Sequence, residues 1–237
     1  PESEMEIRIA EIWKDLLGKE AIGIHDNFFE LGGDSIIGIQ MVSRATRAGI
    51  DITPKDIFDY QTISELAQQI GTSDNTIESE QGILEGEVPL TAVQEWFFER
   101  KFAQQDHWNM SLLFKLNDSI CASTLDKALD AVIEKHDMLR CRYYQKEGTW
   151  YQEMAPLPNE ESLILEDLSD IDDIDERFQK EVDRIEASLD LEKGEVAKFV
   201  LFDLGEEGRR LLLAVHHLVV DGVSWRILLE DIQLACQ

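Results

Sequence analysis

Along residues 1–71, hydrophobic positions recur at helical spacing between short polar or glycine-rich breaks. The first stripe runs from Ser3 to Leu17, where Ser3 and Glu6 match a capping box and Gly18 is a helix stop. Three further helices are expected, from Asp34-Ser35 to about Gly49, at Thr53-Pro54 and from Thr62 to Gly71. The pattern predicts an all-α four-helix domain over residues 1–71.

Residues 72–87 differ in composition from the helical segments before them. They are mostly polar, small or acidic and offer too little apolar surface to order themselves, so we interpret them as a linker. From residue 88 onwards, helical patterns are expected at 91–102, 123–135, 174–189 and 225–232, and strand patterns at 110–116, 139–144, 150–154, 196–204 and 210–220. The chain is therefore predicted to be multi-domain, with an α/β domain over residues 88–237.

The excess of acidic residues disfavours two classes of binding partner. With 22 basic and 49 acidic residues, the formal net charge is −27, which disfavours both nucleic acid and anionic membranes as partners. Cys121, Cys141 and Cys236 are widely spaced, so neither a disulfide framework nor a metal site is indicated, and a cytoplasmic location is expected. The longest apolar run, residues 211–220, is too short to span a bilayer, and the acidic start is unlike a secretory signal.

Ser35 lies between a glycine pair and an apolar-periodic helix, in the string Leu31-Gly32-Gly33-Asp34-Ser35-Ile36. A phosphodiester on Ser35 would sit at a helix N-terminus, where free N–H groups and the helix dipole favour an anion. The alternative is that Ser35 or Asp34 simply caps the helix. A hydrolase nucleophile is disfavoured because the G-x-S-x-G elbow is absent.

Residues 26–36, which include this serine, resemble the core of peptidyl carrier proteins (thiolation domains) of nonribosomal peptide synthetases. The resemblance covers about residues 4–70. It implies that a phosphopantetheinyl transferase attaches phosphopantetheine to Ser35 and that the thiol of this cofactor holds an aminoacyl or peptidyl thioester. In this family, an aspartate at the position of Asp34 is typical of carriers that feed an epimerization domain.

A histidine pair, His216-His217, ends the longest apolar run. In a strand the two side chains point to opposite faces, so they cannot readily chelate one metal ion. One imidazole can instead be fixed in the structure while the other faces a cavity as an acid or base. The alternative is that both histidines only fill core or surface positions. Gly222 is expected to permit a tight turn.

The string His216-His217-Leu218-Val219-Val220-Asp221-Gly222-Val223-Ser224-Trp225 resembles the HHxxxDGxSW motif of condensation and epimerization domains. This resemblance implies the two-lobed chloramphenicol acetyltransferase fold, with residues 88–237 as the N-terminal lobe. It also implies that His217 is the catalytic histidine, that His216 and Asp221 shape the site, and that Asp221 meets a buried arginine. We then expect Asp221→Ala to abolish folding as well as activity.

Residues 89–98 and 107–111 are more similar to the opening of an epimerization domain than to that of a condensation domain. The implied activity is conversion of an L-residue on the carrier to an L/D mixture, after an upstream adenylation domain and before a downstream condensation domain. The family places a glutamate of the second lobe opposite His217. Because the chain starts without methionine and ends at Gln237, we expect an excised fragment that lacks this lobe and is inactive alone. Alternatives are a condensation domain that forms peptide bonds and a docking lobe without catalysis.

Overall fold

The computed structural model describes residues 3–70, 82–117, 119–159, 161–171 and 173–237. The chain divides into two compact units, Pro1–Glu80 and Gln81–Gln237. Residues 72–81 of the expected linker lie outside the described residues. In the part of the chain that is described, no helix combines the length and apolar character needed to cross a lipid bilayer.

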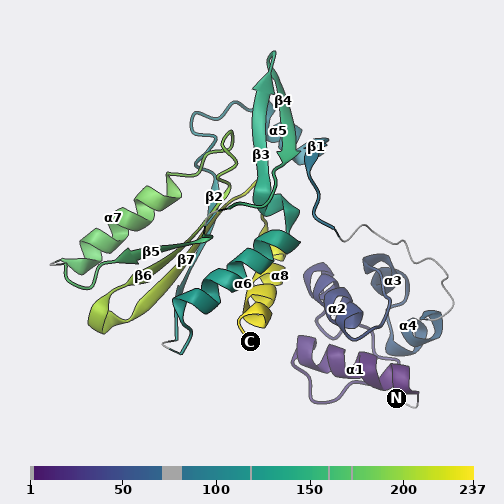
Figure 1. Cartoon of the computed structure of the whole chain (residues 1–237). Coiled ribbons are helices and arrows are strands. Elements are labelled where there is room, and N and C mark those ends of the chain that lie inside the picture. Colours follow the sequence, from purple (N-terminus) through teal and green to yellow (C-terminus); the bar gives the residue numbers. More distant parts are fainter. Residues whose placement is uncertain (1–2, 71–81, 118, 160, 172) are drawn as a thin grey trace. The chain divides into compact units, whose positions relative to one another are not determined.

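Within residues 3–70, the first unit contains four helices (Figure 1): α1 Glu4–Leu17, α2 Ser35–Arg47, α3 Pro54–Asp59 and α4 Ile63–Gln69. The capping box of Ser3 and Glu6 forms as expected, and Gly18 ends α1 in the left-handed conformation with φ 61°. Thr53 and Thr62 cap α3 and α4 in the same way. Side-chain caps therefore set the start of these helices, and apolar packing holds them together.

The long segment between α1 and α2 packs into this unit. Phe28 is fully buried, its ring centre lies 4.9 Å from that of Trp13 of α1, and its N–H donates to the carbonyl oxygen of Gln61 at 2.9 Å. Asn27 donates from its side-chain amide to Gln61 Oε1 at 2.8 Å. The segment that leads into α2 thus contacts both α1 and the residue just before the N-cap of α4.

The second unit is built on two sheets (Figure 1). The smaller has the order β1-β4-β3, from Gly86–Val88, Thr149–Met154 and Cys141–Lys146. The larger has the order β2-β7-β6-β5, from Asn109–Lys115, Arg209–His216, Ala197–Asp203 and Leu163–Asp167. Strands β5 and β6 are parallel, and the other neighbours are antiparallel. The helices are α5 Ala92–Glu99, α6 Ala122–Lys135, α7 Ile174–Glu186 and α8 Gly222–Ala235, with short 3-10 turns η1 Asp137–Arg140 and η2 Gly205–Glu207.

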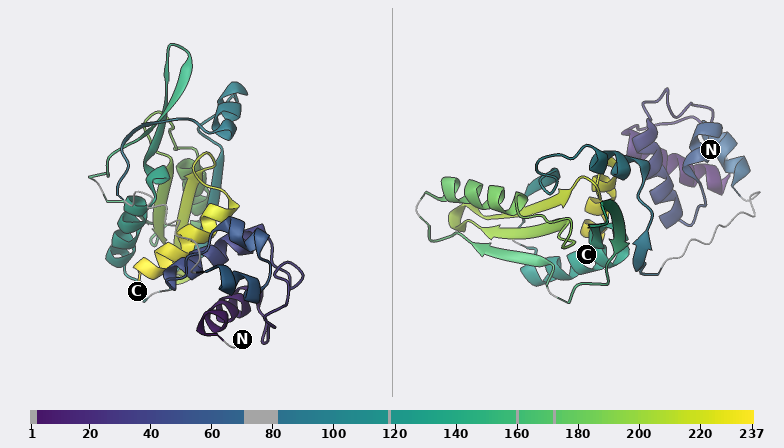
Figure 2. Two further views of the ribbon diagram at one scale, coloured as in Figure 1. Left: turned by 90° about the vertical axis from the view of Figure 1, so that its right-hand side faces the viewer. Right: turned by 90° about the horizontal axis from the view of Figure 1, so that it is seen from above.

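Both faces of the larger sheet are covered by helices, because alternate residues of β7 point to opposite sides. Leu211, Leu213 and Val215 pack with α6 and α8, whereas Leu212 and Ala214 pack with α7. Figure 2 shows α7 on one face of the sheet and α6 on the other. This double cover explains why β7 is an almost continuous apolar run. The central strand β7 ends at His216, and His217 follows directly after it.

Several expected elements have different bounds in the structure. Strands β1 and β5 were not expected, and β1 takes Gly86 and Glu87 out of the predicted linker by pairing them with β4. The strand expected over 139–144 begins only at Cys141, because residues 137–140 form η1. The strand expected over 210–220 ends at His216, and the chain then turns toward α8.

Candidate functional site

Ser35 is the first residue of α2, and its side chain is exposed. The N-cap is Asp34, whose Oδ1 accepts from the N–H of Ile37 at 2.7 Å. Asp34, and not Ser35, therefore supplies the cap. The Ser35 hydroxyl is left available at a helix N-terminus, where a singly charged phosphodiester is favoured by the helix dipole although opposed by the Asp34 carboxylate. An accessible hydroxyl at this point fits a covalently attached phosphopantetheine.

The glycine pair before Ser35 is required by a close approach of the chain to itself. Gly33 donates its N–H to the carbonyl oxygen of Phe28 at 2.9 Å. A Cβ at Gly33 would lie 2.6 Å from that oxygen and 2.5 Å from the Phe28 ring. Gly32 has φ 104°, in the region that favours glycine. The two glycines thus bring Ser35 to the surface directly beside a buried aromatic anchor.

His216 is the buried member of the histidine pair, with 0% exposure. Its Nδ1 accepts from the N–H of Leu218 at 3.1 Å, so its Nε2–H donates to the carbonyl oxygen of Gln105 at 2.8 Å. Burial lowers the pKa of His216, which favours the neutral imidazole. Both ring nitrogens are occupied by backbone groups, and the side chain therefore fixes the turn after β7.

His217 is the exposed member. Its backbone N–H donates to the carbonyl oxygen of Trp108 at 2.8 Å, and its Nδ1–H donates to that of Val220 at 2.7 Å. The second bond leaves Nε2 with the lone pair, and Nε2 has no hydrogen-bond partner among the described residues. An imidazole held in one tautomer, with an accessible basic nitrogen, can accept and return a proton.

Asp221 is the N-cap of α8. Its Oδ1 accepts from the N–H of Val223 at 3.0 Å and from both the N–H and the hydroxyl of Ser224 at 2.7 Å. The hydrogen bonds from Ser224 are the main cause that lowers the pKa of Asp221, and the nearby His217 acts in the same direction. The carboxylate thus combines helix capping with a negative charge close to the exposed imidazole.

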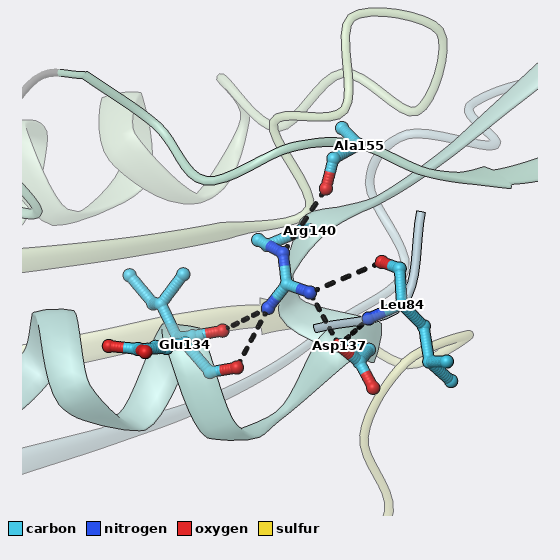
Figure 3. A network of polar contacts seen from close by, with 6 residues as sticks. Leu84, Glu134, Asp137, Arg140 and Ala155 are labelled. Atoms are coloured by element: carbon cyan, nitrogen blue, oxygen red, sulfur yellow. Dashed lines mark hydrogen bonds and ion pairs between the residues drawn. The ribbon is translucent and has the colours of Figure 1, made fainter. Parts of the chain in front are cut away.

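The buried arginine expected beside Asp221 is not found among the described residues, since Asp221 forms no ion pair there. Among the described residues of this unit, Arg140 is the arginine that is buried, with 4% exposure. Figure 3 shows its polar contacts. It forms an ion pair with Asp137 and donates to backbone carbonyl oxygens, including that of Ala155 at 3.1 Å and that of Leu84 at 3.4 Å. Arg140 therefore joins η1 to the segment before β1 and to the end of β4.

Two further residues of the histidine motif, Gly222 and Trp225, have structural roles. Gly222 does not make a tight turn, because it is the first residue of α8. A Cβ at this position would meet nothing within 4 Å, so the space does not require a glycine there. Trp225 is 5% exposed and packs in the core shared by α6, α8 and the larger sheet. The sequence did not indicate that Gln105 and Trp108 hold the histidine pair, because both residues act through their backbone carbonyls.

Residues 84–237 match the condensation domain family, and residues 8–70 match the phosphopantetheine attachment site family. The chain is 46% identical over 239 residues to one of the linear gramicidin synthase proteins of Brevibacillus parabrevis, an alignment that covers 99% of this chain and 5% of that protein. This chain thus spans a small part of the length of such relatives.

Two solved structures are similar to the second unit. The epimerization domain from the third module of tyrocidine synthetase B is 39% identical, with a TM-score of 0.63 over 67% of this chain and 36% of that one. The first condensation domain of the calcium-dependent antibiotic synthetase, in complex with a substrate analogue, is 26% identical, with a TM-score of 0.51 over 63% of this chain and 36% of that one. The chain belongs to the condensation domain family, and ahead of that domain it has a carrier domain of the kind that holds phosphopantetheine covalently.

Proposed function

We propose that this chain takes part in nonribosomal peptide synthesis, and that its second domain epimerizes the α-carbon of an aminoacyl or peptidyl thioester held by its carrier domain. The observation that carries the proposal is the 39% identity to a solved epimerization domain, compared with 26% to a solved condensation domain. The tautomer of His217 meets a chemical requirement of this reaction, because epimerization begins with the removal of a proton by a base.

Ser35 is the proposed attachment point, modified by a phosphopantetheinyl transferase. Its hydroxyl is exposed and Asp34 performs the capping. A Cβ added at the nearby Gly32 would meet nothing within 4 Å, which leaves room for a modifying enzyme. When bound, phosphopantetheine supplies a thioester whose carbonyl withdraws electrons from the α-carbon and makes its proton removable. An upstream adenylation domain and a downstream condensation domain are the proposed neighbours in the assembly.

His217 is the proposed acid/base residue. Its Nε2 takes the α-proton from one face, while the bond from Nδ1–H to the Val220 carbonyl fixes the ring and stabilises the imidazolium that forms. The Asp221 carboxylate caps α8 and places a negative charge near the His217 ring. His216 holds the turn in place and takes no part in proton transfer, since both of its nitrogens are occupied. Inversion also requires a donor on the opposite face, and we assign only the first partner to this chain.

The second candidate function is peptide-bond formation between two loaded carriers. The family match and the 26% identity to a condensation domain favour it to a lesser degree. In that reaction the same Nε2 atom would assist the attacking amine, and the configuration of the α-carbon would not change. The two reactions therefore differ in their products, although they use one histidine.

The test loads Ser35 with an L-aminoacyl-pantetheine group by means of a promiscuous phosphopantetheinyl transferase, in deuterated water. The 237-residue chain and the longest natural polypeptide that contains it are assayed in parallel. Deuterium at the α-carbon reports proton removal, and the chirality of the released amino acid reports inversion. We expect both signals in the longest natural polypeptide, and we expect Ser35→Ala to prevent loading in both proteins.

The matched variants are His217→Gln and His107→Gln, since both histidines are exposed in the second unit. Loss of deuterium uptake in His217→Gln alone is the expected result. Equal uptake in both variants would exclude His217 as the base. A dipeptide of unchanged configuration, formed when a second loaded carrier is added, would replace epimerization by condensation.

A further inference from the structure

Gln94 of α5 places one amide group among three polar partners inside the second unit. The side chain is 4% exposed, and its Oε1 accepts from the N–H of Thr91 at 2.8 Å. Its Nε2 donates to the hydroxyl of Tyr143 at 2.8 Å and to the carbonyl oxygen of Leu218 at 3.5 Å. The acceptor role of Oε1 fixes which end of the amide faces Tyr143 and Leu218.

Leu218 is the residue that follows His217, and both of its backbone polar groups are held by side chains. Its N–H donates to Nδ1 of the buried His216 at 3.1 Å. Its carbonyl oxygen has Gln94 as its hydrogen-bond donor among the described residues. The peptide units on either side of Leu218 thus cannot rotate without breaking one of these bonds.

Buried side chains of β3 and α5 support this turn. Tyr143 of β3 has 0% exposure, and burial raises the pKa of its hydroxyl, so that the group stays protonated. The ring of Phe97, also from α5, packs edge-on against the His216 ring with centres 5.8 Å apart. Helix α5 therefore contacts the turn through an apolar contact to His216 and a polar contact to Leu218.

We infer that Gln94 is a positioning residue for the acid/base function of His217. By holding the Leu218 carbonyl, its amide keeps the turn in the conformation in which His217 donates from Nδ1 to Val220 and presents Nε2 outward. The inference rests on the proposed function for its consequence in catalysis, but the effect on the His217 tautomer is independent of the reaction. A hydrogen-bond donor is required at this point, so a carboxylate of the same shape cannot replace the amide.

This requirement can be tested with two variants that each remove a different hydrogen bond around Gln94. In Gln94→Glu the carboxylate still accepts from the Thr91 N–H and from the Tyr143 hydroxyl, but it cannot donate to Leu218 and repels its carbonyl oxygen. In Thr91→Ala the N-cap hydroxyl of α5 is lost while the amide of Gln94 remains. The first variant removes the proposed contact and keeps the cap, and the second does the reverse.

The measurement is the tautomer of the five histidines in the 237-residue chain, by long-range proton–nitrogen correlation of the imidazole rings, with thermal unfolding recorded for each variant. We expect the wild type and Thr91→Ala to show His217 in the Nδ1–H form, and Gln94→Glu to show a mixture of both tautomers. Gln94→Met, which keeps the volume and lacks the donor, should repeat the result of Gln94→Glu. An unchanged His217 signal in both Gln94 variants would overturn the inference, as would the same shift in Thr91→Ala.

Activity separates this inference from the proposed function. If the wild type exchanges the α-proton, both Gln94 variants should lower kcat by about tenfold or more with little change in KM, because the base is misaligned while the binding surface is kept. If the wild type does not exchange the proton but the tautomer shifts in the Gln94 variants, the proposed function fails and the positioning role stands. Normal kcat with a shifted tautomer would refute the catalytic consequence of the inference.

Discussion

The imidazole of His217 donates from Nδ1 to the carbonyl oxygen of Val220 at 2.7 Å, whereas the ring of its neighbour His216 donates from Nε2. Two adjacent histidines therefore hold opposite tautomers. The buried one presents a basic nitrogen to the backbone, and the exposed one presents a basic nitrogen outward. This difference separates a structural from a chemical role within a single dipeptide, which the sequence pattern alone could suggest but not assign.

The burial of His216 predicts a pH-dependent stability. Burial lowers its pKa in the folded state, so the unfolded state binds the proton more readily. The contribution is fully present above the unfolded pKa of about 6.5 and is lost as the pH falls toward the folded pKa. We expect the free energy of unfolding to fall by at most about 1.4 kcal/mol per pH unit from this group.

Urea unfolding between about pH 7.5 and pH 5 measures this slope. The comparison is with His216→Met, which leaves the other four histidines unchanged. The wild type should lose more stability on acidification than the variant does. Equal slopes in the two proteins would contradict a neutral, buried His216.

The position of Asp221 in the structure predicts that Asp221→Ala causes a moderate loss of stability. The sequence had predicted complete loss of folding. The residue is an exposed N-cap and not the partner of a buried arginine among the described residues. Asp221→Ala should therefore cost about 1 kcal/mol, and Asp221→Asn, which can also cap, should cost less. Thermal unfolding of the two variants checks the order, and a larger loss in Asp221→Asn would oppose the capping role.

The same residue has a pH signature at lower pH. Hydrogen bonds from Ser224 lower the pKa of Asp221 in the folded state. Its stabilising contribution is present above the unfolded pKa of about 3.9 and disappears as the pH falls through the folded value. Asp221→Asn should lack this dependence, because an amide does not titrate in this range.

Sequence reasoning located most helices because their determinants are local. The helix expected at 123–135 is α6, whose buried residues recur at helical spacing: Leu125, Ala128, Leu129, Val132 and Ile133. Capping boxes and Gly18 likewise act within a few residues of each helix end. Such features need no knowledge of the rest of the chain.

The missed strands depend on partners that are distant in the sequence. Strand β1 has three residues and exists through pairing with β4, more than 60 residues later. Strand β5 is an edge strand whose Ile164 and Leu165 are exposed, so it lacks the expected alternation. The end of β7 at His216 is set by the hydrogen bonds of His216 to Gln105 and Leu218, which likewise have no local signal.

Two glycines that look alike in the motifs should respond differently to substitution. Gly33→Ala would place a methyl group 2.6 Å from the Phe28 carbonyl oxygen and should destabilise the first unit by about 1–3 kcal/mol. Gly222→Ala meets open space at the start of α8 and should change stability by less than about 1 kcal/mol.

The test is thermal unfolding of the two variants, together with loading of Ser35 in Gly33→Ala. Loading should slow in that variant because the displaced Phe28 segment leads directly into Ser35. A neutral Gly33→Ala would show that the segment yields easily, and the steric account of the glycine pair would then be wrong.

The three cysteines should react in a fixed order with an alkylating reagent. Cys121 is exposed, and hydrogen bonds from Ser123 and Thr124 lower its pKa to about 7. Burial raises the pKa of Cys141 to about 11. Since the thiolate is the reactive form, iodoacetamide near pH 7 should label Cys121 first and leave Cys141 unlabelled until the domain unfolds.

The hydrogen bonds to Cys121 are tested by Ser123→Ala combined with Thr124→Val. Removing both hydroxyls should move the midpoint of the labelling rate from about pH 7 toward the free-cysteine value of about 8.5, and should slow labelling severalfold at neutral pH. Peptide mapping by mass spectrometry identifies the site, and Cys236, whose pKa is raised by burial, serves as an internal reference. A wild-type midpoint already near 8.5 would show that the two hydroxyls do not stabilise the thiolate.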